Sequence, residues 1–188
     1  MAAFKQSKLK HVGNPLHEII EITDYLYLGS VIPARNEDLL KEKQITHIVN
    51  ATVESDHEYK IPVECMKIKI TDSLECHIGL YFDIVADKIE KVKNMRGKVL
   101  VHCMAGISRS SSLVIAYLMK YKKMSLRDAY HLVKKKRPII NPNPRFWQSL
   151  VDYEKKLFGK TTVTMKESEF GVLVPAIHCK SVKDLFNW

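Results

Sequence analysis

The sequence has few cysteines, and none of them is arranged as a metal site. Its 188 residues include four cysteines, Cys65, Cys76, Cys103 and Cys179. They form no CxxC pair, and no spacing of Cys and His would build a zinc site. Four cysteines are also too sparse to serve as the main disulfide framework of a chain this long. We therefore expect reduced thiols, no bound metal and a location in the cytoplasm or the nucleus.

Long apolar runs, internal repeats and low-complexity segments are absent as well. No apolar run approaches the roughly 18 to 20 residues that span a bilayer, so we expect no membrane span. Residues 1–17 lack the apolar core of a secretory signal and are predicted to form a flexible tail. We expect residues 18–160 to form one globular domain and residues 161–188 to form an extension packed on it.

Acidic residues are outnumbered by basic ones, 21 to 30, which gives a formal net charge of +9. Such an excess favours acidic partners, which include phosphorylated proteins, anionic lipid surfaces and nucleic acid. Residues 120–137 hold eight of the cations and only one acid, Asp128. We expect a solvated helical face whose last cations lie near the negative end of the helix dipole. A docking face for phosphoproteins and an import-type basic cluster are the alternatives.

Predicted strands and helices alternate up to residue 102, and the rest of the domain is predicted to be helical. Short apolar or β-branched runs predict strands at residues 18–22, 25–29, 45–51, 64–70 and 98–102. Three- and four-residue apolar spacing, with caps at Ser125 and Asn143, predicts helices at residues 33–44, 78–95, 109–123, 125–137 and 144–159. This order favours an α/β fold with a central, mostly parallel sheet flanked by helices. Sites in such sheets lie at the carboxyl ends of the strands.

The segment HCMAGISRS, residues 102–110, lies between a predicted strand and a predicted helix. Its backbone N–H groups can curl into a nest of donors, and the start of the helix adds a positive dipole end. Arg109 adds a charged planar fork that binds two oxygens, and Gly106 suits a tight turn. We therefore predict a phosphate-binding loop formed by Met104, Ala105, Gly106, Ile107, Ser108 and Arg109.

Cys103 lies within this positive field, which favours its thiolate form and makes it a nucleophile toward phosphorus. Ser110, next to Arg109, can donate a hydrogen bond to the sulfur when the sulfur later becomes the leaving group. An inert thiol in a polar loop is the alternative. The glycine, the arginine, the serine and the following helix at these spacings favour the catalytic interpretation.

A departing alkoxide or phenoxide needs a proton, so a general acid is expected on another loop. Asp72 directly follows the predicted strand that ends at Ile70 and Thr71, which places it at the same sheet edge as Cys103 if the strands are parallel. It would act first as an acid and then as the base that activates water. Glu75 and Asp56 are rival acids in predicted loops, but neither is as close to the carboxyl end of a strand.

These residues resemble the cysteine-dependent protein tyrosine phosphatase superfamily, whose loop pattern is HCxxGxxR followed by Ser or Thr. All fixed positions match, at His102, Cys103, Gly106, Arg109 and Ser110. Within it, the chain is similar to the small atypical dual-specificity phosphatases. The segment AYLM at residues 116–119 and the stretch RPIINPNPRFWQSL, similar to RPxxxPNxxFxxQL, carry that similarity, which covers roughly residues 18–160.

The resemblance implies a protein tyrosine phosphatase-like fold and hydrolysis of phosphotyrosine and of phosphoserine or phosphothreonine, without metal or cofactor. It places Asp72 in the position of the general acid. It gives His102 a supporting role and places Asn143 at the asparagine that braces the phosphate loop, with Asn141 as a competing candidate. The pair Pro144-Arg145 departs from the small residue and glycine of many relatives. The implied partners are phosphorylated proteins, including kinases of signalling cascades, and no nucleic acid.

Three other functions are compatible with the loop. A phosphoinositide phosphatase would be expected to carry extra lysines beside Cys103, where this chain has Met104, Ala105, Ile107 and Ser108. An RNA 5'-triphosphatase agrees with the basic charge, but aromatic and basic residues are not interleaved as in readers of nucleic acid. A phosphoprotein-binding scaffold would use the same loop, although such proteins usually lack a reactive group. The sequence leaves open whether Cys65 or Cys76 forms a protecting disulfide with Cys103.

Overall fold

A computed structural model describes residues 14–169 and 171–177 of the chain. Its centre is a five-stranded sheet of order β1-β2-β5-β3-β4. β1 is antiparallel to β2, and the other neighbours are parallel. The strands are β1 (Ile20–Glu21), β2 (Leu26–Gly29), β3 (His47–Asn50), β4 (Glu64–Lys67) and β5 (Val99–His102). The predicted mostly parallel α/β sheet is confirmed.

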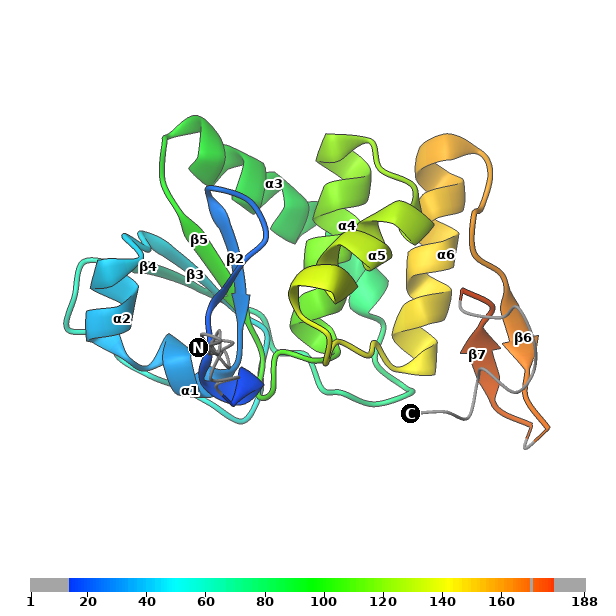
Figure 1. Ribbon diagram of the computed structural model, residues 1–188, viewed down its shortest axis with the longest axis horizontal. Helices are drawn as coiled ribbons and strands as arrows, with labels where there is room; N and C mark the ends of the chain where they lie inside the picture. The colour runs from blue at the N-terminus through cyan, green and yellow to red at the C-terminus, as the bar shows by residue number, and fades with distance from the viewer. Residues whose placement is uncertain (1–13, 170, 178–188) are drawn as a thin grey trace, which may run out of the picture.

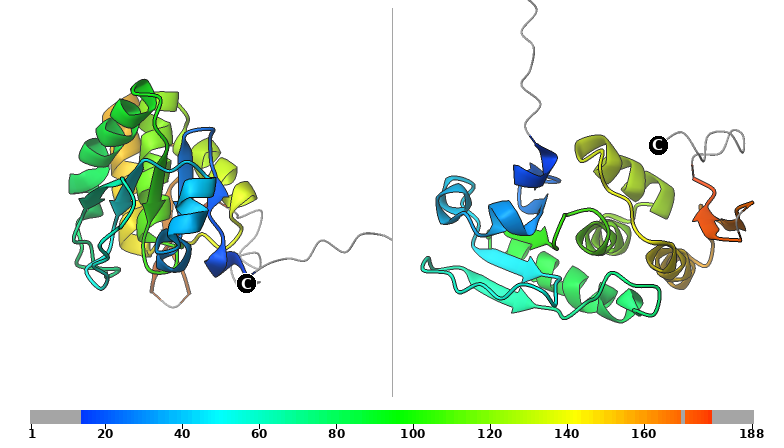
Figure 2. Two further views of the ribbon diagram at one scale, coloured as in Figure 1. Left: turned by 90° about the vertical axis from the view of Figure 1, so that its left-hand side faces the viewer. Right: turned by 90° about the horizontal axis from the view of Figure 1, so that it is seen from below.

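Helices cover both faces of the sheet, and Figure 2 shows α3 on the opposite side from α1 and α2. In Figure 1, α4, α5 and α6 lie side by side next to the sheet. The helical elements are η1 (Pro15–His17), α1 (Val31–Ala34), α2 (Glu37–Glu42), η2 (Ile78–Tyr81), α3 (Phe82–Asn94), α4 (Arg109–Lys122), α5 (Leu126–Lys136) and α6 (Pro144–Phe158). None of these described helices has the length and apolar character that crossing a membrane requires.

The alternation of side chains along the strands explains the two apolar cores. On β5, Val99 and Val101 join the larger core, which α3, α4, α5 and α6 complete, while Leu100 joins a smaller core with Ala34 and Leu40 of α1 and α2. Successive strand residues point to opposite faces. A strand that is apolar at every position is therefore buried on both sides, as the run at residues 98–102 predicts.

Several element boundaries differ from the sequence prediction, and hydrogen bonds explain two of the differences. The helix predicted at residues 33–44 is two short helices, because the Asn36 side chain accepts a hydrogen bond from Leu39 N and starts α2 anew. The strand predicted at residues 64–70 ends at Lys67. Beyond it, Ile70 N donates to Ile68 O, which turns the chain out of the ladder. Ser125 and Asn143 cap α5 and α6 as predicted.

The segment after α6 forms a hairpin of β6 (Met165–Glu167) and β7 (Leu173–Pro175), which lies beyond α6 in Figure 1. Val163 and Ile177 are buried in the larger core. The buried Glu154 of α6 accepts hydrogen bonds from Thr162 N and Leu126 N, at 2.6 and 2.7 Å, which ties this segment to the start of α5. Residues 1–13 of the predicted tail, and residues 170 and 178–188 of the predicted extension, lie outside the described residues.

The basic stretch at residues 120–137 is only partly a solvated face. Lys120 donates to Asp83 at 2.8 Å and also pairs with Asp87, so α3 supplies acids that the stretch itself lacks. Arg137 is 1% exposed. The prediction that all these cations lie on a solvated surface is therefore wrong for Arg137, whose partners are described below.

Candidate active site

The predicted phosphate loop, residues 104–109, follows Cys103 after the carboxyl end of β5 and leads into the first turn of α4. Groups outside the loop occupy several of its carbonyl oxygens. Val31 N donates to Met104 O at 3.1 Å, and Asn141 N donates to Ile107 O at 2.9 Å. With these carbonyls bound from outside, backbone N–H groups of the loop are left for the site itself, as expected for a nest that binds an anion.

Arg137 fixes the middle of this loop. Its Nε donates to Gly106 O and its Nη2 donates to Ala105 O, both at 2.9 Å, while Nη1 donates to Pro15 O at 2.8 Å. Burial acts to lower the pKa of the Arg137 guanidinium, but an arginine in a protein remains charged. Three charge-assisted hydrogen bonds therefore join the loop, α5 and the start of the described chain.

Gly106 is required for both conformation and space. Its φ is +69°, in the left-handed region that side chains rarely adopt. A Cβ at this position would lie 2.5 Å from Gly29 O and 2.8 Å from Arg137 Nη2. The loop backbone thus packs directly on the end of β2, which accounts for the glycine that the motif requires.

Cys103 is 2% exposed, and its sulfur receives two hydrogen bonds. Gly106 N and Ser110 Oγ each donate to Sγ at 3.2 Å. Donated hydrogen bonds stabilise a negative sulfur more than a neutral one. The structure therefore brings Ser110 to the sulfur, as the sequence predicted.

Arg109, 4% exposed, lies at the start of α4 and binds a carboxylate that the sequence analysis missed. Its Nη1 lies 2.8 and 3.0 Å from the two carboxylate oxygens of Glu54 and donates to Ile70 O at 3.1 Å. Burial acts to raise the pKa of Glu54, but hydrogen bonds from Arg109 outweigh it, and the pKa is lowered. Arg109 Nε is buried without a hydrogen-bond acceptor among the described residues, a donor suited to an anionic oxygen.

Asp72 lies beside the phosphate loop, although it follows a loop and not a strand. Its Oδ1 accepts hydrogen bonds from Ser108 Oγ and Asn143 Nδ2, both at 2.8 Å, and Oδ2 lies 3.8 Å from Arg109 Nε. The prediction that Asp72 directly follows a strand is wrong because β4 ends five residues earlier. The parallel arrangement still brings its loop to the same edge of the sheet as Cys103.

The rival acids have other surroundings. Asp56 pairs with Lys67 at 2.8 Å, and this hydrogen bond lowers the pKa of Asp56. Glu75 is exposed, and among the described residues no hydrogen bond or ion pair joins its side chain to the loop. Of the three predicted acids, Asp72 is the one in contact with the phosphate loop.

Asn143 braces this arrangement in three ways. Its backbone N donates to Ser108 Oγ at 3.1 Å, its Nδ2 donates to Asp72, and its Oδ1 accepts from Phe146 N to cap α6. Asn141 contacts the loop through its backbone N alone. Asn143 is thus the asparagine whose side chain links the start of α6 to the loop that carries Asp72.

His102 is buried between the sheet and the loop and is held neutral. Burial lowers its pKa to about 4, and its Nδ1 lies 3.3 Å from Cys103 O. The neutral ring therefore carries its proton on Nδ1 and donates to that carbonyl. His102 supports the loop backbone at Cys103 and does not contact the sulfur in any described hydrogen bond.

The remaining cysteines and possible metal ligands add nothing to this site. Cys65 on β4 is exposed, Cys76 is half-buried, and the three cysteines among the described residues are all free. Within the same ranges, no group of three His, Cys, Asp or Glu side chains is placed to hold a metal ion.

Comparisons with known proteins agree with this geometry. The family model described as "Dual specificity phosphatase, catalytic domain" matches residues 26–156. Human dual specificity protein phosphatase 14 is 47% identical over 170 residues, which cover 90% of this chain and 85% of that protein. Human dual specificity protein phosphatase 18 is 42% identical over 163 residues, covering 87% of this chain and 86% of that protein.

Solved structures show the same fold. The crystal structure of human DUSP28 matches with a TM-score of 0.72 and 28% identity, and the match covers 74% of this chain and 98% of that one. That of the human tyrosine phosphatase-like serine/threonine/tyrosine-interacting protein matches with a TM-score of 0.70 and 34% identity, over 74% and 97% of the two chains. From its sequence, fold and loop geometry together, the chain belongs to the dual-specificity protein phosphatase family.

Proposed function

We propose that this enzyme hydrolyses phosphotyrosine and phosphoserine or phosphothreonine in proteins through a phosphocysteine intermediate at Cys103. One observation carries the proposal. The buried sulfur accepts two hydrogen bonds, and the same loop ends at an arginine whose Nε has no hydrogen-bond acceptor among the described residues and lies 3.8 Å from the Asp72 carboxylate. A nucleophile, an anion-binding cation and an acid are the groups that phosphoryl transfer to a thiolate requires.

In the first step, the Cys103 thiolate attacks phosphorus while the ester P–O bond breaks. The N–H groups of residues 104–109 and the Arg109 guanidinium bind the phosphoryl oxygens, whose charge shifts during transfer. Asp72 donates its proton to the departing alkoxide or phenoxide. Oδ2 is the atom suited to carry that proton, because Oδ1 already accepts from Ser108 and Asn143.

In the second step, water attacks phosphorus and the S–P bond breaks. Asp72, now a carboxylate, takes a proton from that water and returns to its acid form. Ser110 Oγ and Gly106 N stabilise the thiolate as it leaves. The products are inorganic phosphate and the free hydroxyl of the substrate, and neither step uses a metal or cofactor.

Glu54 and the phosphoryl group of the substrate use different nitrogens of the Arg109 guanidinium. Arg109 Nη1 donates to Glu54 and to Ile70 O, whereas Nε has no hydrogen-bond acceptor within the described part of the chain. Glu54 therefore holds the guanidinium in place through one nitrogen while the others serve the phosphoryl group. The Arg109 guanidinium is therefore held in place before substrate binds, which reduces the entropy lost in ordering it on binding.

Phosphorylated proteins are the substrates we propose, and kinases of signalling cascades are the expected partners. This rests on the function of the family and on the net charge of +9, which favours acidic partners. A cytoplasmic or nuclear location stays a prediction from the reduced cysteines.

The test compares wild type with Cys103→Ser on four substrates: a phosphotyrosine peptide, a phosphothreonine peptide, a phosphoinositide and a triphosphate-ended RNA. We expect release of phosphate from both peptides by wild type and none by the variant, because serine is a far weaker nucleophile there. Release confined to lipid or RNA would move the activity to the corresponding alternative. No release from any substrate would favour a phosphoprotein-binding scaffold.

A further inference from the structure

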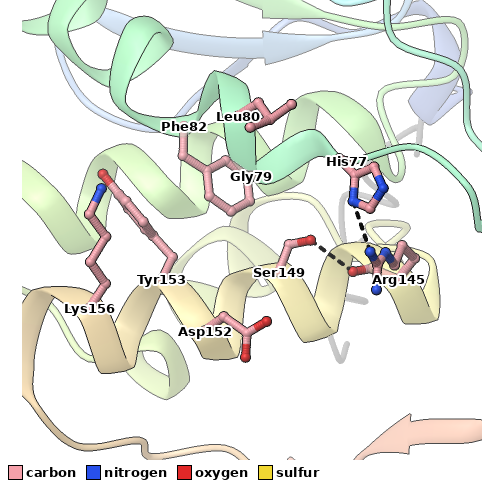
Figure 3. Close-up of a pocket in the computed structure, with 9 residues that line it drawn as sticks. All are labelled: His77, Gly79, Leu80, Phe82, Arg145, Ser149, Asp152, Tyr153 and Lys156. Carbon is pink, nitrogen blue, oxygen red and sulfur yellow. Dashed lines mark hydrogen bonds between the residues drawn. The ribbon is translucent and has the colours of Figure 1, made fainter.

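A groove runs between η2 and the exposed side of α6 (Figure 3). One wall consists of His77, Gly79, Leu80 and Phe82, and the other of Arg145, Ser149, Asp152, Tyr153 and Lys156 of α6. The one carboxylate of the lining, Asp152, accepts a hydrogen bond from Gln148 Nε2 at 2.9 Å. Lys156 follows Arg145 by eleven positions along α6, a rise of about 16 Å. That length equals about five residues of an extended polypeptide. The groove, with a volume of about 320 Å³, therefore has the dimensions of a binding site for a short peptide segment.

One end of the groove adjoins the active site. Arg145 follows Asn143 by two residues, and the Asn143 side chain donates to Asp72 Oδ1 at 2.8 Å. His77, on the opposite wall, lies on the same loop as Asp72, five residues further along the chain. The loop of Asp72 and the start of α6 therefore connect the groove to the phosphate loop, and we expect a polypeptide bound at Cys103 to extend toward Arg145.

Arg145 is a cation without a carboxylate partner among the described residues. Its Nη2 lies 2.8 Å from His77 Nδ1, and because a guanidinium only donates, that ring nitrogen accepts. Its Nε is buried with no acceptor. The other cation of the groove differs, since Lys156 pairs with Asp83 at 2.8 Å. Arg145 is thus a permanently charged side chain that forms no ion pair with any carboxylate of the described residues.

The walls between these cations offer apolar contact. Leu80 is 74% exposed, although its neighbour Phe82 is fully buried. In Figure 3, Leu80 and Phe82 come from η2 and the start of α3, across the groove from Ser149. A groove lined by an exposed leucine and by an arginine without a carboxylate partner among the described residues suits a segment that has both apolar and acidic side chains.

We propose that this groove binds an extended segment of the phosphoprotein substrate, and that Arg145 pairs with an aspartate or glutamate of that segment. The proposal rests on the proposed function. It makes Arg145 a residue that determines specificity without contact to the reacting atoms. Arg145 should therefore affect kcat/KM for peptides long enough to reach the groove. It should not affect kcat/KM for small aryl phosphates, which do not extend that far.

The test uses phosphotyrosine peptides with an alanine-rich host sequence, in which a single glutamate is moved from five residues before the phosphotyrosine to five residues after it. We expect wild type to favour glutamate at one position or two alternate positions by about 5-fold in kcat/KM, the upper range for a partly exposed ion pair. Arg145→Gln removes this preference and Arg145→Lys keeps part of it. Arg96→Gln is the matched control. Exposed Arg96 lies between α3 and β5, at the amino end of β5, whereas the site follows the carboxyl end of that strand.

Hydrolysis of p-nitrophenyl phosphate by each variant separates this proposal from the proposed function. If wild type does not hydrolyse p-nitrophenyl phosphate, the proposed chemistry is overturned. Full activity on the small ester, with no preference for any glutamate position or with a preference that survives in Arg145→Gln, would overturn the groove proposal alone. A kcat/KM that rises equally on every peptide in Arg145→Gln would also overturn it, because the groove would then be occupied by the chain itself or by a second copy.

Discussion

Replacing Gly106 with alanine should destabilise the protein and abolish activity, and Gly159 provides a control for the backbone contribution. Both glycines have nearly the same left-handed φ, +69° and +71°. A left-handed conformation costs an L-residue about 1–2 kcal/mol at either site. At Gly159, a Cβ would meet nothing within 4 Å, so this is the whole expected cost.

At Gly106, the new methyl group would lie 2.5 Å from Gly29 O and 2.7 Å from Gly29 C. Both are backbone atoms of β2, so no side-chain rotation relieves the overlap, and overpacking adds about 1–3 kcal/mol more. We expect Gly106→Ala to lose about 2–5 kcal/mol of the free energy of unfolding. The shift of the loop away from β2 would also displace the N–H groups that bind phosphate.

Urea unfolding of wild type and both variants measures the free-energy difference, and hydrolysis of p-nitrophenyl phosphate measures the effect on the site. We expect Gly159→Ala to keep activity near wild type. If the two variants lose the same stability to within about 0.5 kcal/mol, or if Gly106→Ala retains normal kcat/KM, the close packing of the loop on β2 is not what requires glycine.

Three further perturbations address the loop and the acid. Arg137→Met should lower the free energy of unfolding, measured in a urea titration, by about 3–5 kcal/mol, because three carbonyl acceptors lose their donor. A loss below about 1 kcal/mol would mean that the hydrogen bonds of Arg137 do not stabilise the loop. Ser110→Ala should slow phosphocysteine hydrolysis about 10- to 100-fold. The intermediate should then accumulate, and rapid-mixing kinetics should show a burst of released phenol. A time course without a burst would contradict the role of Ser110. Asp72→Asn should slow hydrolysis of alkyl phosphates by about 10² to 10⁴ and affect activated aryl esters less; equal losses on both would mean that Asp72 is not the acid.

The pH dependence of stability tests the burial of His102. Its pKa is about 4 in the folded protein against 6.5 for a free imidazole, so between these values the unfolded chain binds more protons. Stability should therefore fall as the pH drops from 6.5 to 4, by about 3 kcal/mol from this residue. Urea unfolding of wild type and His102→Gln across this range measures the difference. Parallel curves for the two proteins would show that His102 is not held neutral by burial.

The parts of the site that a local pattern encodes could be predicted from sequence. Cys103, Arg109 and Ser110 lie on one strand-loop-helix unit, so their spacing alone nearly fixes their relation. Asp72 lies on the loop that follows another strand, and the rule for parallel sheets predicts its edge of the sheet even though that strand ends earlier than predicted. That rule tolerates the error because it depends on the sheet edge and not on the last hydrogen-bonded residue.

The parts that depend on which side chain turns inward could not be predicted. Arg137 is one of several adjacent cations, and the charge pattern of residues 134–137 does not distinguish it from half-buried Lys134 or from exposed Lys135 and Lys136. Glu54 follows a predicted strand by a few residues, but its pairing with Arg109 joins residues 55 positions apart. The hairpin of β6 and β7 has strands of three residues, too short for a periodic signal.

The most direct test of the account is to look for the covalent intermediate. Wild type and Cys103→Ser are mixed with a phosphotyrosine peptide, quenched in acid within milliseconds, digested, and analysed by mass spectrometry. We predict that the peptide containing Cys103 gains the mass of one phosphoryl group in wild type, more so in Ser110→Ala, and that the corresponding peptide of Cys103→Ser does not. Turnover of the substrate with no phosphoryl group on Cys103 at any quench time, or with the group on another residue, would contradict the mechanism.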